Sequence, residues 1–73
     1  MTYTVVITRD PEDEREVYNA TVPAMPGCVS WGRTVAEAFA AIQEALALYL
    51  AEFDEAGLPY PPDVRCETGV VTV

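Results

Sequence analysis

A long helical segment with a single apolar stripe limits what this sequence can fold into more than any other feature. Thr34 and Glu37 form a capping-box pair, in which the threonine hydroxyl accepts a backbone N–H and the glutamate reaches back. Gly57 predicts the helix end, because glycine readily adopts the left-handed conformation of a C-terminal cap. Between these signals, apolar residues recur every three or four positions, at Val35, Phe39, Ile42, Leu46, Tyr49 and Phe53. The sequence therefore predicts about six helical turns that need one apolar surface.

Two strand-like segments near the start supply part of that surface. Residues 3–9 and 16–22 are rich in β-branched and aromatic types and alternate in the way that half-buried strands do. Their apolar faces hold Tyr3, Val5 and Ile7 in the first segment and Tyr18, Ala20 and Val22 in the second. The charged, proline-bearing stretch between them predicts a hairpin loop. Pro23 ends the second strand, since proline has no N–H to donate to a sheet.

A turn and a short third strand come next. Residues 25–28, Met-Pro-Gly-Cys, fit a type II turn, because proline presets the first central position and glycine supplies positive φ at the second. Residues 28–31 then predict a strand with Val29 and Trp31 on one face. After the helix, residues 65–73 predict a fourth strand, whose last valines lie on one face.

The order of these elements predicts an α+β domain of type β-β-β-α-β, with a four-stranded sheet and one long helix packed on one face. A crossover through the helix lets the last strand lie parallel to an earlier one, most simply the first. The chain is expected to be a single domain, residues 1–73. One helix cannot cover both faces of four strands, so the second face is expected to be solvated or to meet another chain.

The net charge of the chain limits the classes of molecule that it can bind. Twelve acids against four arginines, with no lysine or histidine, give a net charge of −8. Direct nucleic-acid binding is not expected, because it depends on basic side chains that neutralise phosphate. The acid excess instead favours a basic protein partner. The start shows no secretory pattern, and no apolar run reaches about 20 residues, so a cytoplasmic protein without a membrane partner is predicted.

The residue types give little support for catalysis or metal binding. Cys28 and Cys66 lack a histidine or lysine that could activate them, and packing as small apolar residues is the simpler interpretation of both. Two cysteines make neither a disulfide framework nor a zinc site. The carboxylates gather in residues 10–16 and along the helix, which is typical of solvated surfaces. We therefore predict no enzyme activity, no metal and no cofactor.

Apolar surface beyond the predicted core indicates contact with another chain. Apolar residues make up 51% of the sequence, although a domain of this size buries only roughly 60% of its unfolded surface. Leu48 falls on the outward helix face, among glutamates and alanines. The predicted partner or oligomer contacts are Met25, Trp31, Leu48, Val71 and Val73. A homodimer or tetramer is expected, through the helix face with Leu48 or through edge pairing of the C-terminal run.

Three motifs carry a resemblance to a known family. Residues 18–34 read Y-x-A-x-V-P-x-x-P-G-C-x-S-x-G-x-T, residues 37–50 read EAFAAIQEALALYL, and residues 55–62 read EAGLPYPP. With a first strand of the type YTVVI, the chain resembles the HicB-like antitoxin family over nearly its whole length. The resemblance implies a β-β-β-α-β fold similar to a partial ribonuclease-H-like sheet. The C-terminal DNA-binding module that complete members usually carry is not expected here.

The resemblance also implies a function. Antitoxins of this type bind and mask a small basic toxin, HicA-like and mRNA-cleaving, in a type II toxin–antitoxin pair. A stand-alone oligomer with a structural or small-ligand-binding role is the alternative, with the uncovered sheet face as its contact. An enzyme, either cysteine-dependent or a vestigial nuclease that uses Glu67, is a third and weaker interpretation, because neither a histidine nor a carboxylate cluster supports it.

Overall fold

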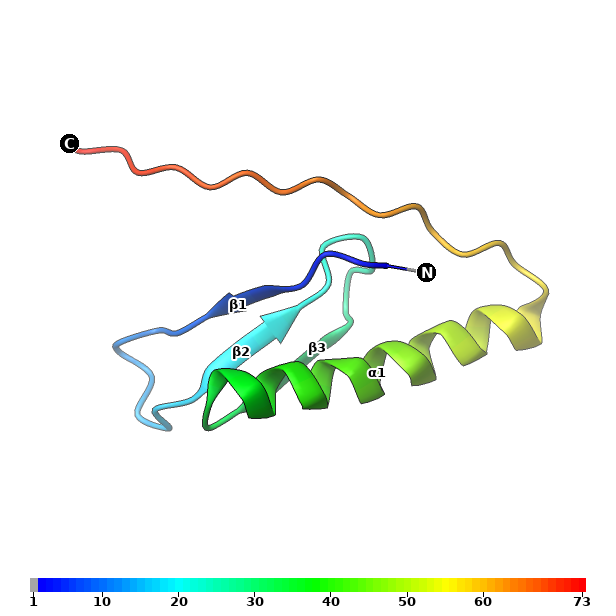
Figure 1. The fold of residues 1–73 in the computed structure, drawn as a ribbon, viewed down its shortest axis with the longest axis horizontal. Coiled ribbons are helices and arrows are strands. Elements are labelled where there is room, and N and C mark those ends of the chain that lie inside the picture. The colour runs from blue at the N-terminus through cyan, green and yellow to red at the C-terminus, as the bar shows by residue number, and fades with distance from the viewer. Residues whose placement is uncertain (1) are drawn as a thin grey trace.

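The fold consists of a small antiparallel sheet and one long helix. The computed structural model describes residues 2–73, and its elements in chain order are β1 (Val6–Thr8), β2 (Tyr18–Thr21), β3 (Val29–Gly32) and α1 (Val35–Ala56) (Figure 1). The described strands form one sheet in the order β1-β2-β3, and both pairings are antiparallel. The predicted α+β class is confirmed.

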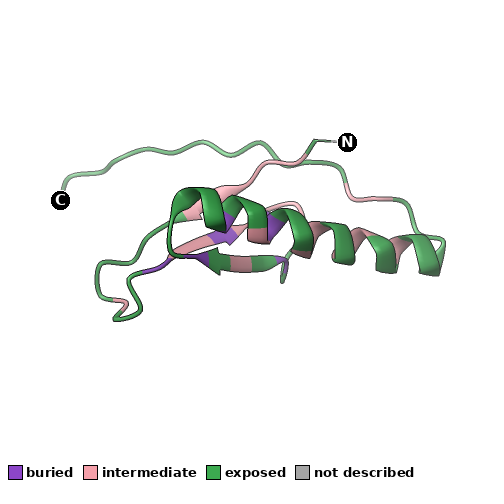
Figure 2. Cartoon of the chain, turned by 60° about the horizontal axis from the view of Figure 1, so that its bottom comes forward, coloured by how far each residue is buried: buried purple, intermediate pink, exposed green. Residues whose placement is uncertain are grey.

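One face of this sheet packs on α1. Ile7 of β1 pairs with Ala20 of β2, and Ala20 pairs with Ser30 of β3. Ala20 is fully buried against Ala38 and Ile42 of the helix. The core therefore lies between this row of the sheet and the first half of α1, where Figure 2 shows the buried positions. Its buried cluster is formed by Ala20, Val22, Met25, Cys28, Ala38 and Ile42.

The helix is longer than the sheet that it covers. Its 22 residues span about 33 Å, whereas strands of three or four residues span only about 10 to 13 Å. The second half of α1 therefore extends past the sheet (Figure 1). Leu46, Tyr49 and Leu50 in that half are only partly buried, against the core cluster.

Both ends of α1 are capped as predicted. The Thr34 hydroxyl accepts the backbone N–H of Glu37 at 3.1 Å. The Glu37 carboxylate accepts the N–H of Arg33 at 2.8 Å, one residue before the cap, where a standard capping box would use the N–H of the cap itself. Gly57 ends the helix in the left-handed conformation, at φ 67, and its N–H donates to the Asp54 carbonyl at 3.2 Å.

The closest approach of β3 and α1 is at Gly32. A Cβ atom at this position would lie 2.6 Å from the Glu37 carbonyl carbon and closer still to the Ala38 backbone nitrogen. Because only glycine permits this approach, Ala38 is the residue that turns onto the sheet and is fully buried. Val35 and Phe39, which the predicted stripe places in the core, are exposed. The stripe is therefore rotated at the start of the helix.

The predicted fourth strand does not form among the described residues. Residues 58–73, which we call the C-terminal arm, contain no strand and run along the outside of the sheet on the β1 side (Figure 1). The alternation at 65–73 indicates β propensity, but propensity does not supply a strand to pair with. The prediction of four strands is wrong for the single chain. The partial ribonuclease-H-like description, which rests on that strand, remains a prediction.

Candidate partner-binding surfaces

The sheet face away from α1 is uncovered by any element of the described chain. Alternation places Trp31 opposite Asn19, and Val29 opposite Thr21, on this face. Trp31 is 51% exposed and Val29 is 60% exposed. With Arg15 they line a shallow depression of about 430 Å³. The predicted pairing of Val29 and Trp31 on one face is confirmed, and this face is open to contact.

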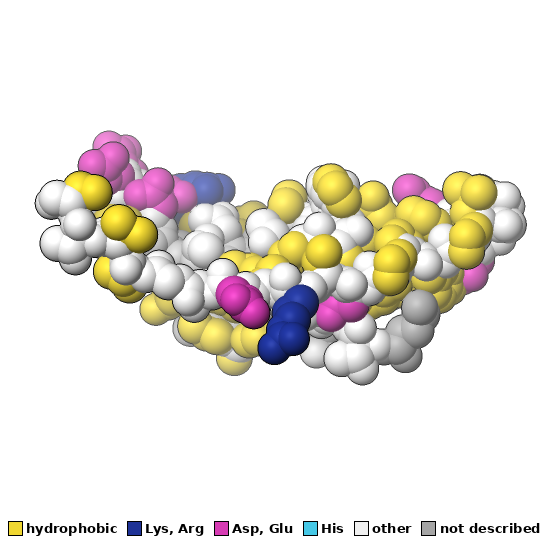
Figure 3. All heavy atoms as spheres, turned by 90° about the horizontal axis from the view of Figure 1, so that it is seen from above, with side chains coloured by type: hydrophobic (Ala, Val, Ile, Leu, Met, Phe, Trp, Pro, Cys, Tyr) yellow, Lys and Arg dark blue, Asp and Glu magenta, His cyan; other side chains and the backbone are white. Residues whose placement is uncertain are grey.

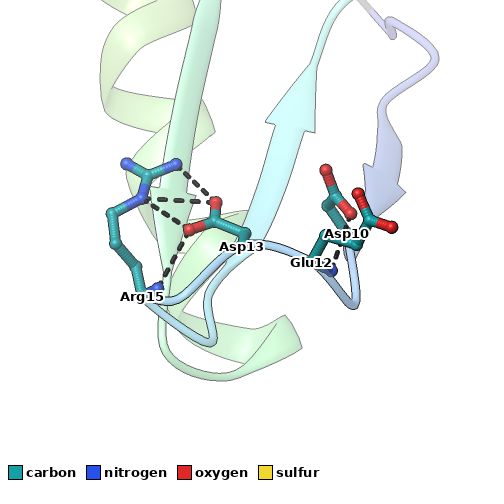
Figure 4. A network of polar contacts seen from close by, with 4 residues as sticks. All are labelled: Asp10, Glu12, Asp13 and Arg15. Carbon is teal, nitrogen blue, oxygen red and sulfur yellow. Dashed lines mark hydrogen bonds and ion pairs between the residues drawn. The ribbon is translucent and has the colours of Figure 1, made fainter.

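An acidic loop borders the same face. Residues 10–16 make two consecutive turns, in which Asp13 N–H donates to the Asp10 carbonyl and Glu16 N–H donates to the Asp13 carbonyl, both at 3.1 Å. The side chain of Asp10 also accepts the N–H of Glu12 at 2.9 Å (Figure 4). Aspartate is suited to this role because its short side chain reaches the backbone two residues on. The loop is therefore held in a defined shape.

Arg15 links the loop to the uncovered face. Its guanidinium donates to Asp13 from Nη2 at 2.7 Å and from Nε at 3.1 Å (Figure 4). These bonds hold the pKa of Asp13 down, at about 2, and Asp13 in turn raises the pKa of Arg15. The loop carries five carboxylates and one guanidinium, so its net charge is −4. Because Arg15 is paired within the loop, the edge of the depression presents an acidic surface.

The expected contact at Met25 is not presented at the surface. Its side chain is 1% exposed and belongs to the buried cluster. The turn at residues 25–28 forms as predicted, with Gly27 at φ 90 and Cys28 N–H donating to the Met25 carbonyl at 3.0 Å. Met25 N–H also donates to the Val22 carbonyl at 2.9 Å, so the loop folds back over the core. This second turn, which was not predicted, buries Met25 and so corrects its prediction as a contact residue.

The two cysteines differ in their surroundings. Cys28 is buried, and burial raises the pKa of its thiol, so the less reactive protonated form is favoured. The interpretation of Cys28 as a packed residue is confirmed. Cys66 is exposed on the arm, so the same interpretation is wrong for Cys66. Over the described residues, no group of three or more His, Cys, Asp or Glu side chains could hold a metal ion.

Apolar side chains on the helix and the arm are also exposed. Leu48 is 72% exposed on the outer face of α1, as predicted. On the arm, Val70, Val71 and Val73 are between 84% and 117% exposed. Seen from above, apolar side chains extend along much of the molecule, and a group of acidic side chains gathers at one end (Figure 3). Whether Trp31, Leu48, Val71 or Val73 contacts a partner stays a prediction, although all four are accessible.

The arm is anchored to the chain start by contacts that no local sequence pattern predicts. Thr4 donates to the Asp63 carboxylate from its backbone N–H at 2.9 Å and from its hydroxyl at 2.7 Å. The Tyr3 hydroxyl donates to the Pro61 carbonyl at 2.6 Å. These residues are almost 60 positions apart, so no local pattern could indicate the contact. The bonds to Thr4 also lower the pKa of Asp63.

The fold and these surfaces define a small α+β domain with one sheet face and one extended segment open to contact. The family described as HicB_like antitoxin of bacterial toxin-antitoxin system matches residues 3–69. The chain is also 40% identical over 63 residues to the UPF0150 protein Ta0767 of Thermoplasma acidophilum, covering 86% of this chain and 87% of that protein. The chain belongs to the HicB-like antitoxin family. Among the described residues, no helix is long and apolar enough to cross a membrane.

Proposed function

We propose that this protein is a non-enzymatic antitoxin that binds and neutralises a small basic toxin of the mRNA-cleaving, HicA-like type. Membership of the HicB-like antitoxin family is the observation that carries the proposal. The acidic balance of the chain supports it, because a net charge of −8 attracts a basic protein and speeds its association. Masking requires only a stable contact surface, and no catalytic group is needed for it.

The uncovered sheet face is the surface that we propose for the toxin. Trp31 and Val29 offer exposed apolar area there, and large aromatic side chains are frequent anchors of protein interfaces. The acidic loop at residues 10–16 borders this face and is held in shape by its own turns. An apolar centre next to an acidic edge suits a basic protein that also has an apolar patch.

If a small basic protein is encoded beside this one, co-expression of the two chains tests the proposal. We expect the two chains to co-purify, and we expect this chain to relieve the growth arrest that the basic protein causes alone. Association should slow as salt rises, because steering between exposed charges is screened. Absence of both a complex and rescue would refute the antitoxin function.

A pair of matched variants tests the proposed surface. Trp31→Arg removes the aromatic anchor and adds a charge that repels a basic partner, so we expect the toxin to bind at least about tenfold more weakly. Leu48→Arg makes the same kind of change on the outer helix face and should leave binding unchanged. Circular dichroism checks that both variants fold. If Leu48→Arg loses binding and Trp31→Arg keeps it, the helix face is the contact instead.

A small-ligand-binding role is a second candidate. The observation that favours it is the depression of about 430 Å³ beside Trp31, which is large enough for a small molecule. In that case a compound should raise the melting temperature of the wild-type protein and should not do so for Trp31→Arg. A response to compounds without any response to a basic protein would favour this role over the antitoxin.

A further inference from the structure

Trp31 lies on a face of the sheet whose strands carry no charged side chain. It sits opposite Asn19 of β2, and Asn19 in turn pairs with Thr8 of β1, so this row contains one indole ring and two neutral polar side chains. The neighbouring row on the same face is formed by Val6, Thr21 and Val29. The strands of this chain therefore bring no charge of their own to the Trp31 ring.

The opposite face shows how an aromatic ring is used in this chain. Tyr18 precedes Asn19 and so points to that opposite face, where the Arg9 guanidinium carbon lies 5.5 Å from the centroid of its ring. A cation above an aromatic face is attracted by the electron density of the ring, and tryptophan is a better platform for it than tyrosine. Trp31 is 51% exposed, and over the described residues no arginine lies above its ring. The better of the two platforms is therefore the free one.

The charges around the depression favour a cation on Trp31. Arg15 is the positive group at its rim, and its guanidinium is bound to Asp13 by hydrogen bonds of 2.7 and 3.1 Å. The rest of the loop at residues 10–16 adds four further carboxylates, which no other arginine of the loop neutralises. A positive side chain is therefore attracted to this end of the sheet, and a negative one is repelled.

From these observations we infer that the partner places an arginine side chain in the depression, with its guanidinium flat on the Trp31 ring. Asn19 and Thr21 line the same depression, and their amide and hydroxyl oxygens can accept from the guanidinium N–H groups. Arginine suits this site better than lysine, because its guanidinium is planar, stacks on aromatic rings and is more weakly hydrated. The inference rests on the proposed function for the nature of the partner, a basic protein, and it makes Trp31 the residue that selects arginine.

Trp31 is the only tryptophan of the chain, so its fluorescence reports directly on this site. Two probes of equal charge, hexa-arginine and hexa-lysine peptides, are titrated into the purified protein. We expect hexa-arginine to half-saturate the fluorescence change at a concentration at least about threefold below that of hexa-lysine. The control is the double variant Trp31→Leu with Leu48→Trp, whose tryptophan lies on the outer face of α1 and should respond equally to both peptides. Equal half-saturation in the wild type, or the same arginine preference in the control, would overturn the inference.

A second test uses the basic partner itself and two variants that each remove one positive charge. Arg15→Gln removes the positive group at the rim and leaves the Asp13 carboxylate free, so we expect it to bind the partner about twofold to threefold more tightly than Arg9→Gln, whose change lies on the opposite face. Equal or weaker binding by Arg15→Gln would overturn the inference. If no basic protein binds even the wild type, the proposed function fails, whereas the peptide comparison still decides whether this face selects arginine.

Discussion

The folded body of the chain, residues 2–57, and its C-terminal arm, residues 58–73, are both rich in β-branched and apolar residues, but only the body buries a group of them in a core. In the body, Ala20 and Ile42 lie on facing elements and are fully buried. On the arm, Val70 and Val71 are more apolar than Ala20 and only slightly less apolar than Ile42, yet they are almost entirely exposed. Side-chain type therefore does not account for the difference.

What separates the two regions is the availability of a partner element at the right distance along the chain. β1 and β2 are joined by a hairpin loop, and β3 follows β2 through the turns at residues 22–28, so each strand meets its neighbour nearby. The arm is hydrogen-bonded to the chain start, just before β1, through Tyr3 with Pro61 and Thr4 with Asp63. Its apolar end is carried past the sheet. The position that the chain gives each residue relative to the sheet and the helix, more than the residue's hydrophobicity, decides which residues are buried.

The largest effect is expected from truncating a covered residue of the body. Ile42→Ala removes a fully buried side chain between the sheet and α1, and should lower the free energy of unfolding by about 2 to 5 kcal/mol. Chemical denaturation measures this difference. Ile42→Val should lower the free energy of unfolding by about 0.5 to 1.5 kcal/mol, and it tests the same position if the alanine variant fails to fold.

The control for this change is Leu48→Ala on the outer face of the helix. Leu48 is as apolar as Ile42 but largely exposed, so its truncation should alter the free energy of unfolding by no more than about 0.5 kcal/mol. Equal losses of unfolding free energy at Ile42 and Leu48 would show that burial does not decide how much an apolar residue stabilises this fold.

A second contrast compares a glycine of the body with a glycine of the arm. Gly32→Ala places a methyl group against the backbone of Glu37 and Ala38, which cannot move aside as a side chain could. We expect it to lower the free energy of unfolding by about 1 to 3 kcal/mol. Gly69→Ala meets no atom within 4 Å and should leave the free energy unchanged. Denaturation curves check both values.

Thermal stability offers an independent test of the Gly32 contact. The melting temperature of Gly32→Ala should fall well below that of the wild type. The melting temperature of Gly69→Ala should equal that of the wild type. If Gly32→Ala keeps wild-type stability, β3 and α1 do not approach as closely as the structure places them. That result would also remove the reason why Ala38 is buried in place of Phe39.

Local sequence signals predicted the body well. Thr34 and Gly57 fixed both ends of α1, because caps depend on residues within a turn of the helix end. Gly27 fixed the turn before β3 for the same reason. The rotation of α1 toward Ala38 was missed, since it follows from the close approach at Gly32. A glycine at the strand end, directly before the helix cap, is the signal that could have indicated it.

The candidate surfaces were harder to predict than the fold. Val29 and Trp31 were placed on one face because strand alternation is a local property. Asn19 and Thr21, which share that face, could have been found by applying the same alternation to the second strand. Met25 was misjudged, because its burial depends on how a whole loop folds back onto the core. The contact of Thr4 with Asp63 joins positions far apart in the sequence, so no local sequence pattern indicates it.

The smallest expected effect concerns the pH dependence of the arm contact. The N–H of Thr4 and then its hydroxyl donate to the Asp63 carboxylate and lower its pKa below the ordinary value of 3.8. A lowered pKa in the folded state means that the contact contributes stability above the ordinary value and loses it as pH falls through the folded value. Asp13, which a charged guanidinium holds at about 2, should keep its contact to lower pH.

Carbon-detected NMR titration of the two carboxyl groups measures this order directly. We expect Asp63 to titrate below its ordinary value and Asp13 lower still, with the Thr4 amide exchanging faster once Asp63 is protonated. Thr4→Val keeps the backbone donor and removes the hydroxyl, so the pKa of Asp63 should rise partway toward its ordinary value, while that of Asp13 stays fixed. An Asp63 that titrates at its ordinary value in the wild type would show that Thr4 does not hold the arm. The placement of the arm beside the sheet would then lose its support.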